Sequence, residues 1–257
     1  MNDIIKNGKE VIRIEAAAVA DLQHSINQDF VNAVETIFNS NGRVVFTGMG
    51  KSGLIARKIV ATLNSTGTAA IYLHPTDALH GDLGMVRSDD VVILISKSGE
   101  TEEISKLLPM LKRLNVKLIA MSSNKDSKLV RACDIFLKVS VKEEACPYDL
   151  APTASTTATL ALGDALAVSL LKKRNFTATD FAFLHPGGSL GKRLSLKIKE
   201  VMITGDRIPK VNKDTSIKDV IFEITSKRLG TTCVLDESGN LAGIITDGDL
   251  RRLLEKT

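Results

Sequence analysis

The stretch Val91-Val92-Ile93-Leu94-Ile95-Ser96-Lys97-Ser98-Gly99-Glu100-Thr101 decides the fold of this chain. Its first five residues are β-branched or leucine, and they predict a strand buried on both faces, as in a parallel sheet. Hydroxyl side chains then surround one glycine, and a helix is expected over 102–114. Free backbone N–H groups at the start of such a helix attract an anion. The pattern therefore predicts a phosphate-binding turn between a strand and a helix.

Strands and helices alternate on both sides of this stretch. Such alternation predicts an α/β fold, with a five-stranded parallel sheet flanked by helices and strand order 2-1-3-4-5. In this order the loops after strands 1 and 3 meet where the sheet topology opens a ligand crevice. After a helical segment over 3–40, the expected strands are 44–46, 70–73, 91–95, 117–121 and 135–139, and the expected helices are 52–63, 102–114 and 155–171.

The loop after the first strand reads Gly48-Met49-Gly50-Lys51-Ser52-Gly53. It fits GxGxxG and the end of a P-loop, but neither longer pattern is complete. Val45 stands where a P-loop needs glycine, and the second strand ends in His74 rather than the acid of a dinucleotide site. Two interpretations remain open. The loop is a tight strand-to-helix turn, or it is a second phosphate-side loop in which Lys51 supplies a charge.

Several ionisable residues follow the predicted strands. Glu100 and Glu102 are interpreted as favouring a helix N-terminus through its dipole. Glu103 lies further into the helix and can face the crevice, and Glu144 follows the last strand on the same side. His185 precedes a Pro-Gly-Gly turn, a position more natural for acid–base chemistry than for packing.

His74 and His80 flank a proline-containing loop that also holds Asp77 and Asp82. Such a group could suggest a metal, but its spacing matches no strong ligand signature. Polar contacts to a ligand are the preferred interpretation, and no metal is expected to be required.

Composition excludes several classes of function. The 257 residues carry a net charge of +4 spread among many acids, with 4% aromatic residues and no Trp. Base-stacking platforms and basic stripes are absent from the sequence, so no nucleic-acid partner is expected. No signal-peptide pattern or apolar stretch of about 18–20 residues is evident, which predicts no membrane span. Three scattered cysteines suit a reducing cytoplasm.

Near residue 198 the pattern changes to a small βαββα run, which predicts a second module over 199–257 after a domain over 1–198. Asp214 and Asp247 are weak candidates for ligand contacts there. A module of this size is expected to need a partner surface.

These motifs together resemble a sugar isomerase (SIS) domain, and more closely the family of D-arabinose-5-phosphate isomerases of lipopolysaccharide (Kdo) biosynthesis. The resemblance covers residues 1 to about 198, and the remainder resembles a CBS motif. The residues that carry it are the two loops quoted above, His74–Thr76, His80–Gly84, Glu144–Pro147, Leu150–Thr153, His185–Gly188 and Thr246–Arg251.

The resemblance implies interconversion of D-ribulose 5-phosphate and D-arabinose 5-phosphate by an intramolecular oxidoreductase without a cofactor. It implies a homotetramer with active sites near subunit contacts, and an inhibitory zinc that His74 could bind. The family usually carries two CBS motifs, which form a nucleotide cleft as a pair, so nucleotide regulation is not expected of one motif. The implied catalytic residues are Lys51, Glu103, Glu144 and His185, and the implied substrate-binding residues are Ser52, Gly67, Thr68, His74, His80, Ser96, Ser98 and Thr101.

The expected chemistry moves a proton between two sugar carbons through an enediol. Either Glu103 or Glu144 is the base, and the sequence does not decide between them. Lys51 would stabilise the oxyanion and His185 would assist ring opening. A metal-assisted hydride shift is the alternative mechanism, and a sugar-phosphate sensor is the alternative class of function.

Overall fold

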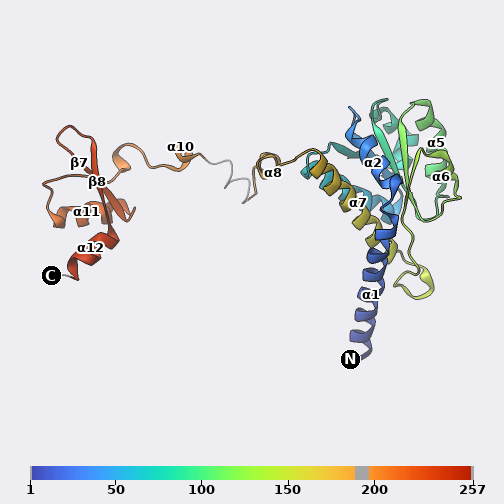
Figure 1. Ribbon diagram of the computed structural model, residues 1–257, viewed down its shortest axis with the longest axis horizontal. Helices are drawn as coiled ribbons and strands as arrows, with labels where there is room; N and C mark the ends of the chain where they lie inside the picture. Colours follow the sequence, from blue (N-terminus) through green and yellow to red (C-terminus); the bar gives the residue numbers. More distant parts are fainter. Residues whose placement is uncertain (1, 189–196, 256–257) are drawn as a thin grey trace. The chain divides into compact units, whose positions relative to one another are not determined.

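The computed structural model describes residues 2–188 and 197–255. The chain divides into two compact units, Met1–Ser195 and Leu196–Thr257 (Figure 1). Each unit has its own sheet.

The larger unit is built on five parallel strands in the order β2-β1-β3-β4-β5, which confirms the predicted fold class and topology. Every residue of β1 and β3 is buried, because both faces of the sheet are covered. The two strands pair from Val44↔Val91 to Gly48↔Ile95, so the loops after them leave the sheet side by side. The strands are β1 Val44–Gly48, β2 Ala70–Tyr72, β3 Val91–Ile95, β4 Lys117–Ser122 and β5 Ile135–Lys138.

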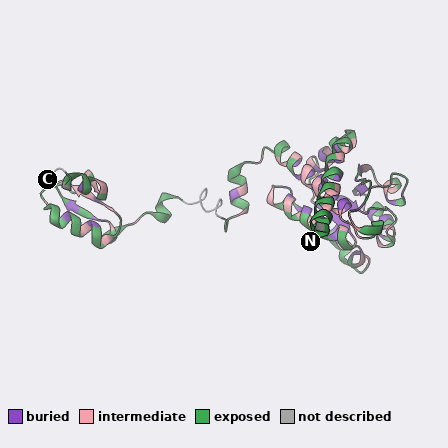
Figure 2. Cartoon of the chain, turned by 90° about the horizontal axis from the view of Figure 1, so that it is seen from below, coloured by how far each residue is buried: buried purple, intermediate pink, exposed green. Residues whose placement is uncertain are grey.

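Helices cover both faces of this sheet. Successive side chains of a strand point to opposite faces, so Phe46 packs toward α2, α3 and α7, whereas Val45 packs toward α4, α5 and α6. The buried residues accordingly concentrate between the layers (Figure 2). The helices are α1 Asn2–Asp21, η1 Leu22–Ser25, α2 Gln28–Phe38, α3 Gly50–Ser65, α4 Pro75–Leu79, η2 Asp82–Met85, α5 Glu102–Arg113, α6 Lys128–Ala132, η3 Pro147–Asp149, α7 Ala154–Lys173 and α8 Ala178–Leu184.

The predicted helical segment over 3–40 is two helices. The Asn27 side chain accepts the backbone N–H groups of Asp29 and Phe30 and so caps the N-terminus of α2. The break turns α2 onto the sheet, where Phe30 and Ile37 are buried.

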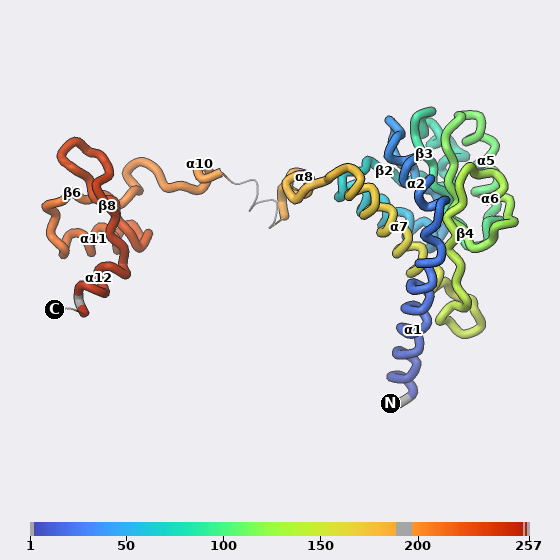
Figure 3. Tube along the Cα trace, in the orientation of Figure 1, coloured from blue at the N-terminus to red at the C-terminus, as the bar shows by residue number. Residues whose placement is uncertain are grey.

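Among the described residues, α7 is the one helix long and apolar enough, by length and composition, to cross a membrane. The prediction that no such apolar stretch exists is therefore wrong for this segment. Half of its apolar window is buried inside the protein, where it packs against α1, α2 and α3 (Figure 3). Small residues permit this close packing: a Cβ on Gly163 would lie 2.4 Å from the Ile59 side chain. Packing within the core accounts for the composition of α7.

The smaller unit has the predicted βαββα order. Strand β7 pairs parallel with β6 and antiparallel with β8. The hydrophobic core of this unit contains Val211, Val220, Ile224 and Leu250. Large apolar side chains such as Phe222 remain exposed. Its elements are α10 Ile198–Val201, η4 Gly205–Arg207, β6 Lys210–Asn212, α11 Ile217–Lys227, β7 Thr231–Leu235, β8 Leu241–Thr246 and α12 Asp247–Leu254.

Candidate functional site

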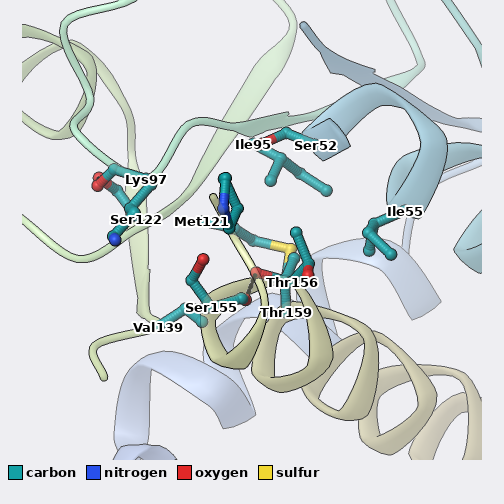
Figure 4. A pocket seen from close by; sticks show the side chains of 11 residues that line it. Ser52, Ile55, Ile95, Lys97, Met121, Ser122, Val139, Ser155, Thr156 and Thr159 are labelled. Atoms are coloured by element: carbon teal, nitrogen blue, oxygen red, sulfur yellow. Dashed lines mark hydrogen bonds between the residues drawn. The ribbon is translucent and has the colours of Figure 1, made fainter. Parts of the chain in front are cut away.

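A cavity of about 400 Å³, counting its solvent-open mouth, lies at the carboxyl edge of the larger sheet. The carboxyl ends of β3 and β4, the loops after β3 and β5, and the first turns of α3 and α7 surround it (Figure 4). Its floor is apolar and its walls carry hydroxyl groups and one lysine. The lining residues are Ser52, Ile55, Ile95, Lys97, Met121, Ser122, Val139, Pro152, Ser155, Thr156 and Thr159.

The turn after β3 is held in shape by its own hydroxyl groups. Ser96 is buried, its Oγ lies 2.8 Å from the Thr101 Oγ1, and it accepts the backbone N–H of Gly99 at 3.0 Å. Gly99 has a φ of +70°, and a Cβ there would lie 2.1 Å from the Ser127 Oγ. Thr101 precedes α5 without capping it through its side chain. The first N–H groups of α5 are therefore available to an anion beside these hydroxyls.

The acidic residues after this turn have different surroundings. Glu100 accepts the backbone N–H of Lys128 at 2.9 Å and so supports the start of α6. Glu102 is exposed and pairs with Lys106 at 2.6 Å. Glu103 is half-buried, and no described residue hydrogen-bonds its carboxylate. Of the three, Glu103 has the carboxylate most available for chemistry.

The loop after β1 is a tight turn that also contributes to the cavity. The hydroxyl of Tyr72 donates to the Gly48 carbonyl at 2.7 Å, and a Cβ on Gly53 would lie 2.5 Å from that hydroxyl oxygen. Ser52 lines the cavity, while Lys51 is exposed in the first turn of α3. The loop is therefore a tight strand-to-helix turn, and a role for it beside a phosphate, with Lys51 supplying a charge, stays a prediction.

Glu144 is the most tightly held carboxylate at this edge. Its side chain is 1% exposed; Oε1 lies 2.7 Å from the Lys97 Nζ, and Oε2 accepts the backbone N–H groups of Thr153 at 2.8 Å and Ser155 at 3.0 Å. Burial raises the pKa of Glu144, but hydrogen bonds from Lys97, Ser155 and Thr153 outweigh it and lower the pKa to about 2. The sequence analysis did not include Lys97 among the candidate site residues. A lysine inside a hydroxyl-rich turn was the feature that could have identified it.

His74 and His80 lie at the two ends of α4, which packs on α5. The His74 Nδ1 is buried without a hydrogen-bond partner among the described residues and lies 3.8 Å from the Asp77 carboxylate. His80 is exposed. In the described part of the chain, no group of three or more His, Cys, Asp or Glu side chains could hold a metal ion. Zinc binding at His74 stays a prediction.

Three predicted site residues lie elsewhere in the larger unit. Gly67 and Thr68 precede β2 at the amino edge of the sheet, where Arg174 donates to the Thr68 hydroxyl at 3.3 Å. His185 follows α8, with its ring stacked on Phe181. Thr68 contacts Arg174 just after the carboxyl end of α7, and His185 follows that end in the chain, whereas Ser155 and Thr156 place the cavity at the amino end of α7. A helix of 20 residues is about 30 Å long, so one chain does not bring them to the cavity.

The two candidate ligand residues of the smaller unit, Asp214 and Asp247, lie in different segments of that unit. Asp214 lines a pocket with Asn212, Lys213 and residues 235–238. Asp247 is the first residue of α12.

Comparison with known proteins identifies the family. The SIS domain matches residues 36–169 and the CBS domain matches residues 198–256. Arabinose 5-phosphate isomerase KdsD of Salmonella typhi is 55% identical over 253 residues, which are 98% of this chain and 77% of that protein. The chain belongs to the arabinose 5-phosphate isomerase family.

Solved structures agree with this membership and confirm the resemblance seen in the sequence. The Escherichia coli CFT073 protein c3406, solved in complex with arabinose 5-phosphate, is 45% identical with a TM-score of 0.70, over 72% of this chain and 98% of that one. A putative sugar-phosphate isomerase from Listeria monocytogenes is 38% identical with a TM-score of 0.70, over 72% and 97%.

Glycine at position 99 is expected to be required for the observed shape of the turn after β3. In Gly99→Ala, the positive φ and the contact with Ser127 should lower the free energy of unfolding by about 1–3 kcal/mol and raise KM. Gly8→Ala is the control, because nothing lies within 4 Å of an added Cβ in α1. Urea unfolding and steady-state kinetics measure both effects. A Gly99→Ala variant as stable and active as Gly8→Ala would contradict the account.

The lowered pKa of Glu144 predicts a pH-dependent stability. The folded pKa of about 2 lies below the ordinary 4.5, so the unfolded chain binds more protons between these values. The stabilisation is therefore present above about pH 4.5 and is lost as pH falls toward 2, by at most about 3 kcal/mol. The difference in free energy of unfolding between wild type and Glu144→Gln should shrink over this window.

Tyrosine fluorescence during urea unfolding measures this difference. The chain has two tyrosines and no Trp, and both Tyr72 and Tyr148 lie in the larger unit. Glu143→Gln is the control, since Glu143 is the exposed neighbour. An equal wild-type advantage over Glu144→Gln at pH 7 and pH 3 would argue against the assignment.

Proposed function

We propose that this protein is an aldose–ketose isomerase that interconverts D-ribulose 5-phosphate and D-arabinose 5-phosphate for Kdo and lipopolysaccharide biosynthesis. The observation that carries the proposal is the carboxyl edge itself. There a hydroxyl-lined turn, the N-terminus of α5 and a buried carboxylate–lysine pair follow strands β3 and β5 of the sheet, and Lys97 of this pair lines the cavity. Family membership supplies the sugar, because the relatives at 55% identity are arabinose 5-phosphate isomerases.

The two ends of the substrate need different groups. The phosphate would be held by the turn after β3 and the first N–H groups of α5. The substrate-binding residues proposed on this chain are Ser52, Ser96, Ser98, Thr101, His74 and His80. At the sugar end, a carboxylate moves a proton between C1 and C2, and Lys51 stabilises the charge on the carbonyl oxygen. Glu103 or Glu144 is the base, and His185 assists ring opening.

The reaction requires no external oxidant or reductant, because one carbon of the sugar is reduced as its neighbour is oxidised. The proposed scheme therefore uses no redox cofactor, and it assigns the transfer to a carboxylate rather than to a metal-assisted hydride shift. The proton that leaves one carbon returns to the next through the enediol, with the carboxylate as its carrier.

We propose that the active protein is a homo-oligomer, specifically a tetramer. His185, Gly67 and Thr68 lie at one end of α7 and the cavity lies at the other. In a symmetric assembly, a surface of one subunit meets a different region of the next, so these residues can complete a neighbour's site. Exposed apolar side chains on α1, such as Ile4 and Ile12, are consistent with subunit contacts.

The remaining assignments concern the whole chain. We propose residues 1–198 as the isomerase domain and residues 199–257 as a single CBS motif, without nucleotide regulation by that motif alone. A cytoplasmic location is proposed because Cys133, Cys146 and Cys233 are free thiols.

The decisive experiment offers ribulose 5-phosphate alongside ribose, arabinose and fructose phosphates and identifies each product. Conversion restricted to ribulose and arabinose 5-phosphates supports the proposal. In deuterium oxide with a chelator, solvent deuterium should enter the product and activity should persist. Product without deuterium, or activity abolished by the chelator, would favour a metal-assisted hydride shift. Absence of isomerisation with every sugar would overturn the function.

A further inference from the structure

Lys97 occupies a place that the proposed scheme leaves without a role. Among the described residues that line the cavity, it carries the one formal charge. In Figure 4 it lies beside Ser122, across the cavity from Ser155 and Thr156 of α7. Its main chain is fixed, because the Lys97 carbonyl accepts the Ser123 backbone N–H at 3.1 Å and the hydroxyls of Ser122 and Ser123. Only the side chain is free to move.

The two oxygens of Glu144 have different partners. Oε2 accepts two backbone N–H groups, from Thr153 and Ser155, which hold the carboxylate in place. Oε1 has Lys97 as its hydrogen-bond donor. If the ammonium moved away, the carboxylate would keep its position while Oε1 became free. The backbone N–H groups at Oε2 therefore fix the position of the carboxylate, whereas, among the described residues, Lys97 alone controls whether Oε1 is available to another group.

Lys97 also belongs to the turn proposed to bind phosphate. Its side chain is 42% exposed and the Glu144 side chain is 1% exposed, so the lysine is the partner able to reorient. A phosphate ester carries about −1.5 to −2 charges at pH 7, against one for a carboxylate. An ammonium within reach of both anions is attracted more strongly to the phosphate.

We propose that Lys97 is a positioning residue whose ammonium leaves Oε1 of Glu144 for the substrate phosphate, so that phosphate binding frees this oxygen to contact the sugar. The inference rests on the proposed function. It makes the carboxylate available only when a phosphorylated substrate is bound. In the free enzyme, the ion pair keeps Glu144 charged and occupied.

Inorganic phosphate provides a test that does not depend on turnover. Lys97→Met keeps the length of the side chain and removes its charge, and it should weaken phosphate binding measured by calorimetry by about tenfold or more. Lys97→Arg should retain binding. Lys128→Met is the matched control, because Lys128 is exposed on α6 and its ammonium lies 3.7 Å from the carboxylate of Glu100 in the same turn. Phosphate affinity in Lys97→Met equal to that of wild type would overturn the proposal.

Kinetics supply the second readout. The charged group that contacts the Glu144 carboxylate is Lys97, and Asp149 lies 4.0 Å from the Lys97 ammonium and accepts the Glu144 backbone N–H. The start of α7 presents backbone N–H groups to the same carboxylate. Without the ammonium, burial raises the pKa of Glu144, so the acid limb of kcat/KM should shift to higher pH in Lys97→Met. KM for the sugar phosphate should rise and kcat should change little.

Different results would overturn the role of Lys97 and the proposed isomerase function. Phosphate affinity and KM in Lys97→Met equal to those of wild type would overturn the role of Lys97 while leaving the isomerase proposal intact. A wild-type protein that binds phosphate through Lys97 but isomerises no pentose phosphate would overturn the proposed function instead. The titration of the substrate phosphate is common to all variants and cancels in the comparison.

Discussion

Replacement of Glu103 by glutamine is expected to lower the turnover of ribulose 5-phosphate by roughly 10²–10⁴-fold. The change keeps the size of the side chain and removes its ability to accept a proton. Glu103 is half-buried in the first turn of α5, directly after the turn that follows β3, and no described residue hydrogen-bonds its carboxylate. Glu144, by contrast, has both oxygens occupied and a pKa of about 2 in the free protein. Glu103 is therefore the stronger candidate for the base.

Glu102→Gln is the matched control for this prediction. Glu102 precedes Glu103 in the same turn, so both carboxylates interact similarly with the helix dipole. It is 77% exposed and pairs with Lys106 on the outer surface, where ion pairs contribute little to stability. Turnover of Glu102→Gln should remain near that of wild type. A Glu103→Gln variant within a few-fold of wild type would transfer the role to Glu144, and near-normal turnover of Glu144→Gln as well would remove the scheme.

The sheet was predictable because its signals are local. Five consecutive β-branched or leucine residues define β3, and the structure places that strand over the predicted residues, Val91–Ile95. Helix ends were less predictable. For example, α3 begins at Gly50, two residues before the expected start, because a glycine with a φ of +53° opens the helix inside the turn. The break at Asn27 was also missed, since one capping side chain divides an otherwise helical pattern.

The site was predictable only as far as topology extends. Loops after parallel strands share one edge, which places Ser52, Ser96 and Glu144 together without any knowledge of side chains. The Lys97–Glu144 pair joins residues 47 positions apart, and its formation depends on how the segment between β5 and α7 folds back. Sequence spacing carries no information on such a contact. His185 and Thr68 lie toward the carboxyl end of α7, away from the cavity, so their proposed roles depend on the proposed assembly of several chains.

Mixing two impaired variants is expected to restore activity. Glu103→Gln and His185→Ala subunits should each be slow alone, because each lacks one group of the proposed site. If Glu103 of one subunit and His185 of another complete a site, about a quarter of the sites in a random mixed oligomer contain both original residues. Co-expressed subunits should then reach about a quarter of the wild-type rate, far above either variant alone.

The control for this experiment pairs residues that lie on one edge of the same chain. Lys51 and Glu103 follow β1 and β3, which are adjacent in the sheet. Every site in a mixture of Lys51→Ala and Glu103→Gln subunits lacks one of the two groups, so no recovery is expected. Recovery in the His185 mixture alone assigns that histidine to the neighbouring subunit. If neither mixture recovers while both form mixed oligomers, His185 does not complete a partner's site, and the separation along α7 excludes it from the cavity of its own chain.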